Sequence, residues 1–156
     1  MMGRTDLSSY LMRTSNKKSS LSSSGHSSEE ARGIVLVIDD DPGIRSLIEE
    51  CLTQWGYLVS LAHDGVEGVN LFRENRYSMV ISNYTMPGLS GTEVCRALRS
   101  IDPKVPILMV SGQAQEQIDF GDERPHLAGF LQKPFSLADL QTGIEQAFSG
   151  SLEGSW

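Results

Sequence analysis

Residues 34–42 read Ile-Val-Leu-Val-Ile-Asp-Asp-Asp-Pro, and this stretch does most to define the fold. Five consecutive apolar residues, most of them β-branched, are typical of a strand that is buried on both faces of a parallel sheet. The run stops at Asp39. Asp41 followed by Pro42 predicts the start of a helix, because Asp caps a helix and Pro fits its first turn. The stretch therefore predicts a buried strand, a loop that carries carboxylates, and a helix.

The same alternation continues beyond this first unit. Further strands are predicted at 57–62, 79–82, 105–110 and 129–132, and helices at 42–55, 65–74, 92–100, 113–120 and from 136 onward. Val66 and Leu137 are among the helical residues expected to face the core. Strands that alternate with helices, without hairpin signals, imply right-handed crossovers. We therefore expect an α/β fold, a doubly wound five-stranded parallel sheet with helices on both faces.

Composition and charge exclude several classes of protein. The chain has 156 residues, 39% of them hydrophobic, and a net charge of −7, which disfavours a nucleic-acid partner. No apolar run approaches the roughly 20 residues of a membrane span. The two cysteines, Cys51 and Cys95, fall inside helical patterns, which indicates reduced core thiols in a cytoplasmic protein. Three scattered histidines do not match a zinc-finger spacing.

The ends of the chain differ from its middle. Residues 1–32 contain ten serines and carry a charge of about +2, and we expect this Ser-rich leader to be disordered. It lacks the apolar segment of a secretory signal, and a solvated linker or an over-long gene start is favoured over a transit peptide. The domain is predicted at 33–148, and residues 149–156 are predicted to be a flexible tail.

Polar side chains occur where the predicted strands end, and the carboxyl ends of parallel strands form the usual site of such sheets. Oxygen ligands favour Mg²⁺ over zinc, and a lysine and a hydroxyl beside a metal would receive a phosphoryl group. The alternative for Asp39 and Asp40 is a capped loop, and Asp41 is predicted to be only a helix cap. Lys133 is expected to pair with the aspartates whatever the function is. The residues at these ends are Asp39, Asp40, Asn83, Thr85, Ser111 and Lys133.

Four segments resemble one known family. The chain is similar to the receiver domain of two-component response regulators over about residues 33–148. The resemblance implies a flavodoxin-like receiver fold, a signalling module that is not an enzyme, and a histidine kinase or phosphotransfer protein as partner. It also implies partner contacts, and a possible homodimer, through the fourth helix, the fifth strand and the last helix. The segments are Val-Leu-Val-Ile-Asp-Asp-Asp-Pro at 35–42, Met-Val-Ile-Ser-Asn-Tyr-Thr-Met-Pro-Gly at 79–88, Ile-Leu-Met-Val-Ser-Gly at 107–112 and Gly-Phe-Leu-Gln-Lys-Pro-Phe at 129–135.

The resemblance also implies a role for each matching residue. Asp39, Asp40 and the backbone carbonyl of Thr85 would hold Mg²⁺. Ser111 would be a switch hydroxyl that moves toward a phosphoryl group, and Phe130 the aromatic residue that rotates with it. Lys133, with a cis bond to the next proline, would pair with a phosphoryl oxygen. The alternative for Phe130 is a plain core aromatic residue.

Asn83 departs from the family, because the phosphoacceptor at this position is an aspartate. A carboxylate oxygen can attack phosphorus and form an acyl phosphate, whereas the neutral amide cannot form the same product. Asn83 can still offer a neutral oxygen ligand, so the affinity for Mg²⁺ is expected to fall and not to vanish. Ser82 is expected to point to the opposite face, and the hydroxyls of Tyr84 and Thr85 are weak nucleophiles.

These observations predict a two-component phosphorelay receiver module that does not accept a phosphoryl group at Asn83 and acts through protein contacts. The first alternative is an ordinary Mg²⁺-dependent phosphoreceiver whose native residue 83 is aspartate. A distant alternative is a haloacid-dehalogenase-type phosphotransferase, which the Asp-x-Asp pattern at 39–41 suggests and the following Pro42 disfavours. Because no effector domain follows residue 148, the output is expected to be a partner protein, or the chain a fragment of a hybrid kinase.

Overall fold

One parallel sheet runs through the part of the chain that the computed structural model describes, residues 31–118 and 126–150. The first 30 residues of the predicted 1–32 leader lie outside the described residues, as do 119–125 and 151–156. Within the described residues the sheet has five strands in the order β2-β1-β3-β4-β5, which is the predicted fold class. The strands are β1 (Ile34–Ile38), β2 (Leu58–Ala62), β3 (Met79–Asn83), β4 (Ile107–Ser111) and β5 (Gly129–Gln132).

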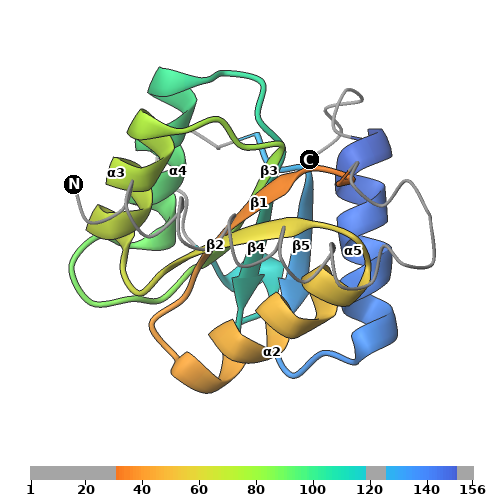
Figure 1. Ribbon diagram of the computed structural model, residues 1–156. Helices are drawn as coiled ribbons and strands as arrows, with labels where there is room; N and C mark the ends of the chain where they lie inside the picture. The colour runs from red at the N-terminus through yellow and green to blue at the C-terminus, as the bar shows by residue number, and fades with distance from the viewer. Residues whose placement is uncertain (1–30, 119–125, 151–156) are drawn as a thin grey trace.

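Helices cover both faces of the sheet (Figure 1). α2 (Pro42–Gln54) and α5 (Leu137–Gly150) pack on one face, and α3 (Gly65–Glu74) and α4 (Gly91–Ile101) pack on the other. Successive side chains of a strand point to opposite faces, so β1 contributes Leu36 to one core and Val37 to the other. Within the described residues, no helix is both long and apolar enough to cross a bilayer.

Local signals in the sequence explain where the helices begin. The Asp41 side chain accepts hydrogen bonds from the backbone N–H groups of Gly43 and Ile44, which confirms its predicted role as the cap of α2. α4 begins with a capping box, in which Ser90 and Glu93 each accept a hydrogen bond from the other residue's backbone N–H. These caps orient both helices at the edge where β1 and β3 end.

The core contains both cysteines as predicted, but some helical faces differ from the prediction. Cys51 and Cys95 are buried free thiols. Val66 and Leu137 are 55% and 51% exposed, so their predicted inward orientation is wrong. In α3 the buried stripe runs through Gly65, Gly68, Val69 and Phe72, which turns Val66 toward solvent. Leu137 opens α5 one turn ahead of Leu140, the first buried residue of that helix.

Several element boundaries also differ from the predicted ones, and β4, for example, begins at Ile107 and not at 105. The helix predicted at 113–120 is a single 3-10 turn, η3 (Gln115–Gln117), within the part of the chain that the structure describes. The Gln, Ala and Glu residues of this segment are good helix formers, so local preference does not explain the short turn. α5 extends to Gly150, which is two residues into the segment predicted as a tail.

Candidate functional site

The candidate site lies at the carboxyl edge of the sheet. β1 pairs with β2 on one side and with β3 on the other. The connections that follow β1 and β3 therefore run in opposite directions and leave a crevice beyond the ends of these strands. Asp39 and Asp40 follow β1, Asn83 ends β3, Ser111 ends β4, and Lys133 follows β5. The parallel register thus brings residues from four separate strands to one edge.

Asp39 is held from several sides. Its side chain is only 2% exposed and lies 3.5 Å from the Lys133 ammonium, which is the expected pairing of the lysine with an aspartate. The Asp41 backbone N–H donates to the Asp39 carboxylate at 2.9 Å, and the Arg45 guanidinium donates to the Asp39 backbone carbonyl at 2.8 Å. Burial raises the pKa of the Asp39 carboxyl, and the Asp41 N–H and the Lys133 charge oppose that rise.

Asn83 is the centre of a second set of contacts. Its side chain is buried, and its amide nitrogen donates at 3.2 Å to the carboxylate of Asp40 and at 2.8 Å to the backbone carbonyl of Thr85. Asp40 itself is exposed to solvent. One NH₂ group therefore joins the loop after β1 to the loop after β3.

Ser111 and Phe130 lie on the β4–β5 side of the site. Ser111 is completely buried, and its hydroxyl accepts a 2.9 Å hydrogen bond from the backbone N–H of Gln113. The Ser111 carbonyl accepts a 2.7 Å hydrogen bond from the Lys133 backbone N–H, so the two residues are tied through the main chain. Phe130 is half-buried and packs on the core beneath α3 and α4, as a plain core aromatic residue also would.

The donor atoms at this edge decide whether Mg²⁺ could bind here. Asp39 and Asp40 offer carboxylate oxygens and Thr85 a carbonyl, which are suitable ligands. However, Asn83 directs an NH₂ group, and not an oxygen, at two of these ligands. Among the described residues there is also no cluster of three or more His, Cys, Asp or Glu side chains able to hold a metal. As arranged, these residues do not fit a bound Mg²⁺.

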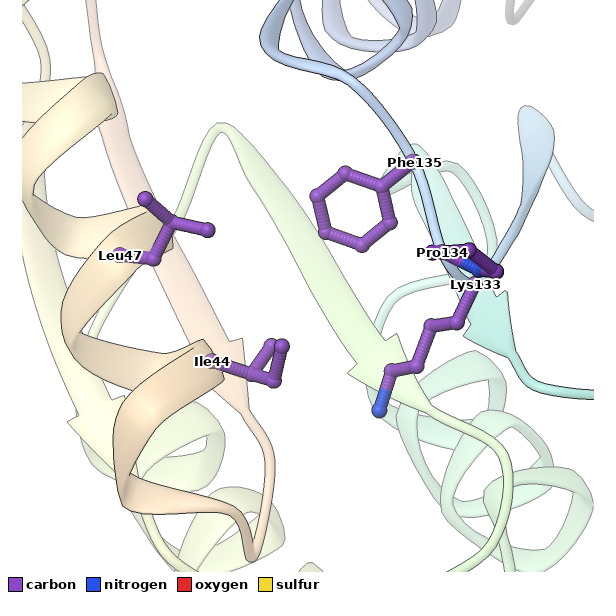
Figure 2. A pocket seen from close by; sticks show the side chains of 5 residues that line it. All are labelled: Ile44, Leu47, Lys133, Pro134 and Phe135. Carbon is purple, nitrogen blue, oxygen red and sulfur yellow. The ribbon is translucent and has the colours of Figure 1, made fainter.

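An apolar pocket of about 390 Å³ adjoins the site (Figure 2). Ile44 and Leu47 on α2 face Phe135 across it, and the stem of Lys133 and the ring of Pro134 complete the lining. The Lys133–Pro134 bond is cis, as the resemblance implies. The sequence did not predict this pocket, because Ile44 and Leu47 occur at the same helical spacing as the core residues of α2. The sequence signal that could have indicated an apolar surface beside the lysine is Phe135, which directly follows Lys133-Pro134.

Comparison with known proteins identifies the family. The model of the response regulator receiver domain matches residues 35–145. Response regulator MprA of Mycobacterium sp. (strain KMS) is 38% identical over 106 residues, which are 68% of this chain and 46% of that protein. The homologue from Mycobacterium avium (strain 104) is 36% identical over the same length. The chain thus aligns with a little under half of the length of these relatives.

Solved structures agree with the sequence relatives. Chemotaxis protein CheY4 of Vibrio cholerae superposes with a TM-score of 0.69 at 30% identity, covering 75% of this chain and 99% of that one. The receiver domain of sensor histidine kinase PA1611 from Pseudomonas aeruginosa has a TM-score of 0.69 at 26% identity, covering 76% of this chain and 99% of that one. The latter structure has a magnesium ion coordinated in its active-site cleft.

The family match covers most of the chain and spans β1 to α5. It decides against the haloacid-dehalogenase-type alternative, since it includes all four segments on which the resemblance to receivers rests. The chain belongs to the response regulator receiver domains, which are non-enzymatic signalling modules of two-component systems.

Proposed function

We propose that this receiver domain does not accept a phosphoryl group at residue 83 and that it signals through protein contacts. The observation that carries the proposal is the amide at the end of β3. Asn83 occupies the crevice between Asp40 and the Thr85 carbonyl, where the family has its nucleophilic carboxylate. The amide oxygen of Asn83 carries no full negative charge, and the nitrogen lone pair is delocalised into the carbonyl, so Asn83 lacks the carboxylate oxygen that attacks phosphorus.

Neighbouring hydroxyls offer no clear replacement. The Ser82 hydroxyl donates to the Asn83 backbone carbonyl, and the Ser111 hydroxyl accepts from a backbone N–H. A hydroxyl becomes a strong nucleophile when an adjacent base takes its proton, and these two contacts provide no base.

The direct test uses a small phosphoryl donor. Incubation of the full chain with acetyl phosphate and Mg²⁺ should add no mass, because residue 83 offers no carboxylate for attack. Intact-mass spectrometry measures the result, and an Asn83→Asp variant treated in parallel shows whether the remaining site can accept the group. A gain of one phosphoryl on the unmodified chain would overturn the proposal.

A second candidate is an ordinary phosphoreceiver whose native residue 83 is aspartate. The placement of Asp39 beside Lys133 favours it, because the lysine is held where a phosphoryl oxygen would need a positive charge. In that form Ser111 would be the switch hydroxyl and Phe130 the aromatic residue that follows it. Mg²⁺-dependent labelling of Asn83→Asp by a histidine kinase, and an aspartate codon in the native gene, would support this candidate.

We further propose the partners of the module. The family implies a cognate histidine kinase, and a phosphotransfer protein is the alternative. A partner that reached Lys133 would meet the apolar pocket between Leu47 and Phe135. The surface proposed for protein contacts and a homodimer includes β5, α5 with its exposed Leu137, and η3, which lies where the fourth helix was predicted. Nucleic acid and membrane are not expected partners, and we propose a cytoplasmic location for the module, because free thiols persist there.

A further inference from the structure

Two oxygen atoms from separate loops converge on the Asn83 side chain. One is a carboxylate oxygen of Asp40 from the loop after β1, and the other is the Thr85 carbonyl from the loop after β3. Two acceptors directed at a common point require a positive or hydrogen-bond-donating group between them. In this chain that group is the amide nitrogen of Asn83, which uses one hydrogen for each oxygen.

The orientation of the amide follows from these neighbours. If the side chain were turned over, its oxygen would face the Asp40 and Thr85 oxygens, and both hydrogen bonds would become repulsive contacts. The side chain is only 6% exposed, so water could replace the lost bonds only in part. An oxygen from Asn83 is therefore not freely available to a cation at this position.

The net charge of the site also determines how much repulsion between carboxylates a cation could relieve. Asp39, Asp40 and Lys133 together leave one net negative charge, and an aspartate at residue 83 would leave two. Asp39 already has the Lys133 ammonium at 3.5 Å, and the remaining carboxylate, Asp40, is exposed to water. A divalent cation would therefore relieve little repulsion here, whereas it would relieve a strong one beside a third carboxylate.

We propose that the Asn83 amide nitrogen takes the place of the divalent cation, so that this receiver site is complete without metal. The amide joins the β1 and β3 loops as a shared cation would. This inference extends the proposed function, but it depends on the hydrogen bonds of Asn83 and not on whether phosphoryl transfer occurs.

Thermal unfolding of the full chain with and without excess MgCl₂ tests the proposal. The unmodified chain should show the same melting temperature in both conditions, after correction with NaCl of equal ionic strength. Asn83→Asp should melt at a lower temperature without Mg²⁺, because it brings a third carboxylate to Asp39 and Asp40, and should recover with Mg²⁺. Asn70→Asp adds the same charge on an exposed position of α3 and should show no dependence on Mg²⁺.

A second measurement remains informative if Asn83→Asp does not fold without metal. In ¹H–¹⁵N spectra of the unmodified chain, the Asn83 side-chain NH₂ should show two resolved, slowly exchanging protons that Mg²⁺ does not shift. A rise in melting temperature of the unmodified chain with Mg²⁺, or a shift of these NH₂ signals, would overturn the inference. A phosphoryl gain without either change would overturn only the proposed function.

Discussion

Asn83 differs from an aspartate by an NH₂ group in place of one oxygen, and that exchange reverses the hydrogen-bonding character of the end of β3. A carboxylate could only accept at this position, whereas Asn83 donates to two oxygens. Lys133 is not left without a partner by the change, because Asp39 remains 3.5 Å away. The Lys133–Asp39 contact is thus the main charge pair of the site, and its energetic role can be measured.

Replacing Lys133 with Met should destabilise the domain by about 2 kcal/mol, less than for a fully buried pair because Lys133 keeps 24% of its side chain exposed. The loss arises because the Asp39 carboxylate stays buried after its counter-charge is gone. Urea unfolding checks the value. Lys104→Met removes an exposed lysine as control and should change the free energy of unfolding by less than about 0.5 kcal/mol.

A double-mutant cycle with Asp39→Asn separates the pair from its surroundings. If the contact is favourable, the two substitutions together should cost less than their sum by about 1 kcal/mol. Simple additivity would mean that the 3.5 Å approach contributes nothing measurable to stability.

At the scale of elements, most of the fold could be predicted because apolar runs and caps are local signals. The run at 34–38 and the Asp41 cap are confirmed without adjustment. Val66 and Leu137 were placed wrongly because the direction of a helix face depends on which strand it meets, and that contact is not local. The convergence of Asp39 with Lys133 followed from sheet topology, but the orientation of the Asn83 amide could not be predicted, because Asp40 is 43 positions away.

Gly91, at the start of α4, explains how the loop after β3 is held. A Cβ atom on Gly91 would lie 2.6 Å from the Tyr84 Cα and 2.9 Å from the Asn83 carbonyl oxygen, which are both backbone atoms and cannot turn away. Gly91→Ala should therefore destabilise the domain by about 1 to 3 kcal/mol, measured by urea unfolding.

Gly112→Ala is the matched control for Gly91→Ala, because a Cβ at Gly112 would meet nothing within 4 Å. Its effect should stay within about 0.5 kcal/mol. If the two substitutions destabilise the domain equally, Gly91 is not needed for the close packing of α4 on the end of β3. In that case, the position of the Thr85 carbonyl would need another explanation.

At the scale of the whole molecule, the sheet separates two cores, and among the described residues the polar site lies at its carboxyl edge. One core joins β1 and β3 to α2 and α5, and the other joins the sheet to α3 and α4. Because the sheet is shared, titration of a group deep in either core acts on the folding of the entire domain. Cys95 is such a group. It is completely buried on the inner face of α4, and burial raises the pKa of its thiol to about 12.

The sign of the resulting pH dependence follows from the two states of Cys95. The pKa of the Cys95 thiol is about 9 in the unfolded chain and about 12 in the folded chain. Between these pH values the unfolded state loses the proton and the folded state keeps it, so a rise in pH favours unfolding. The stabilisation is fully present below pH 9 and is lost as the pH rises toward 12, at up to about 1.4 kcal/mol per pH unit. Urea unfolding at about pH 8 and about pH 10.5 measures this slope.

Cys95→Ala isolates the contribution of this thiol from those of Tyr57, Tyr77 and Cys51, whose pKa values are also raised by burial. The variant should be less stable at pH 8, because it leaves a small cavity. It should nevertheless lose less stability than the unmodified chain on going to alkaline pH. Parallel losses in the two proteins would mean that alkaline unfolding starts from the tyrosines or Cys51, and that the core under α4 admits water before Cys95 ionises.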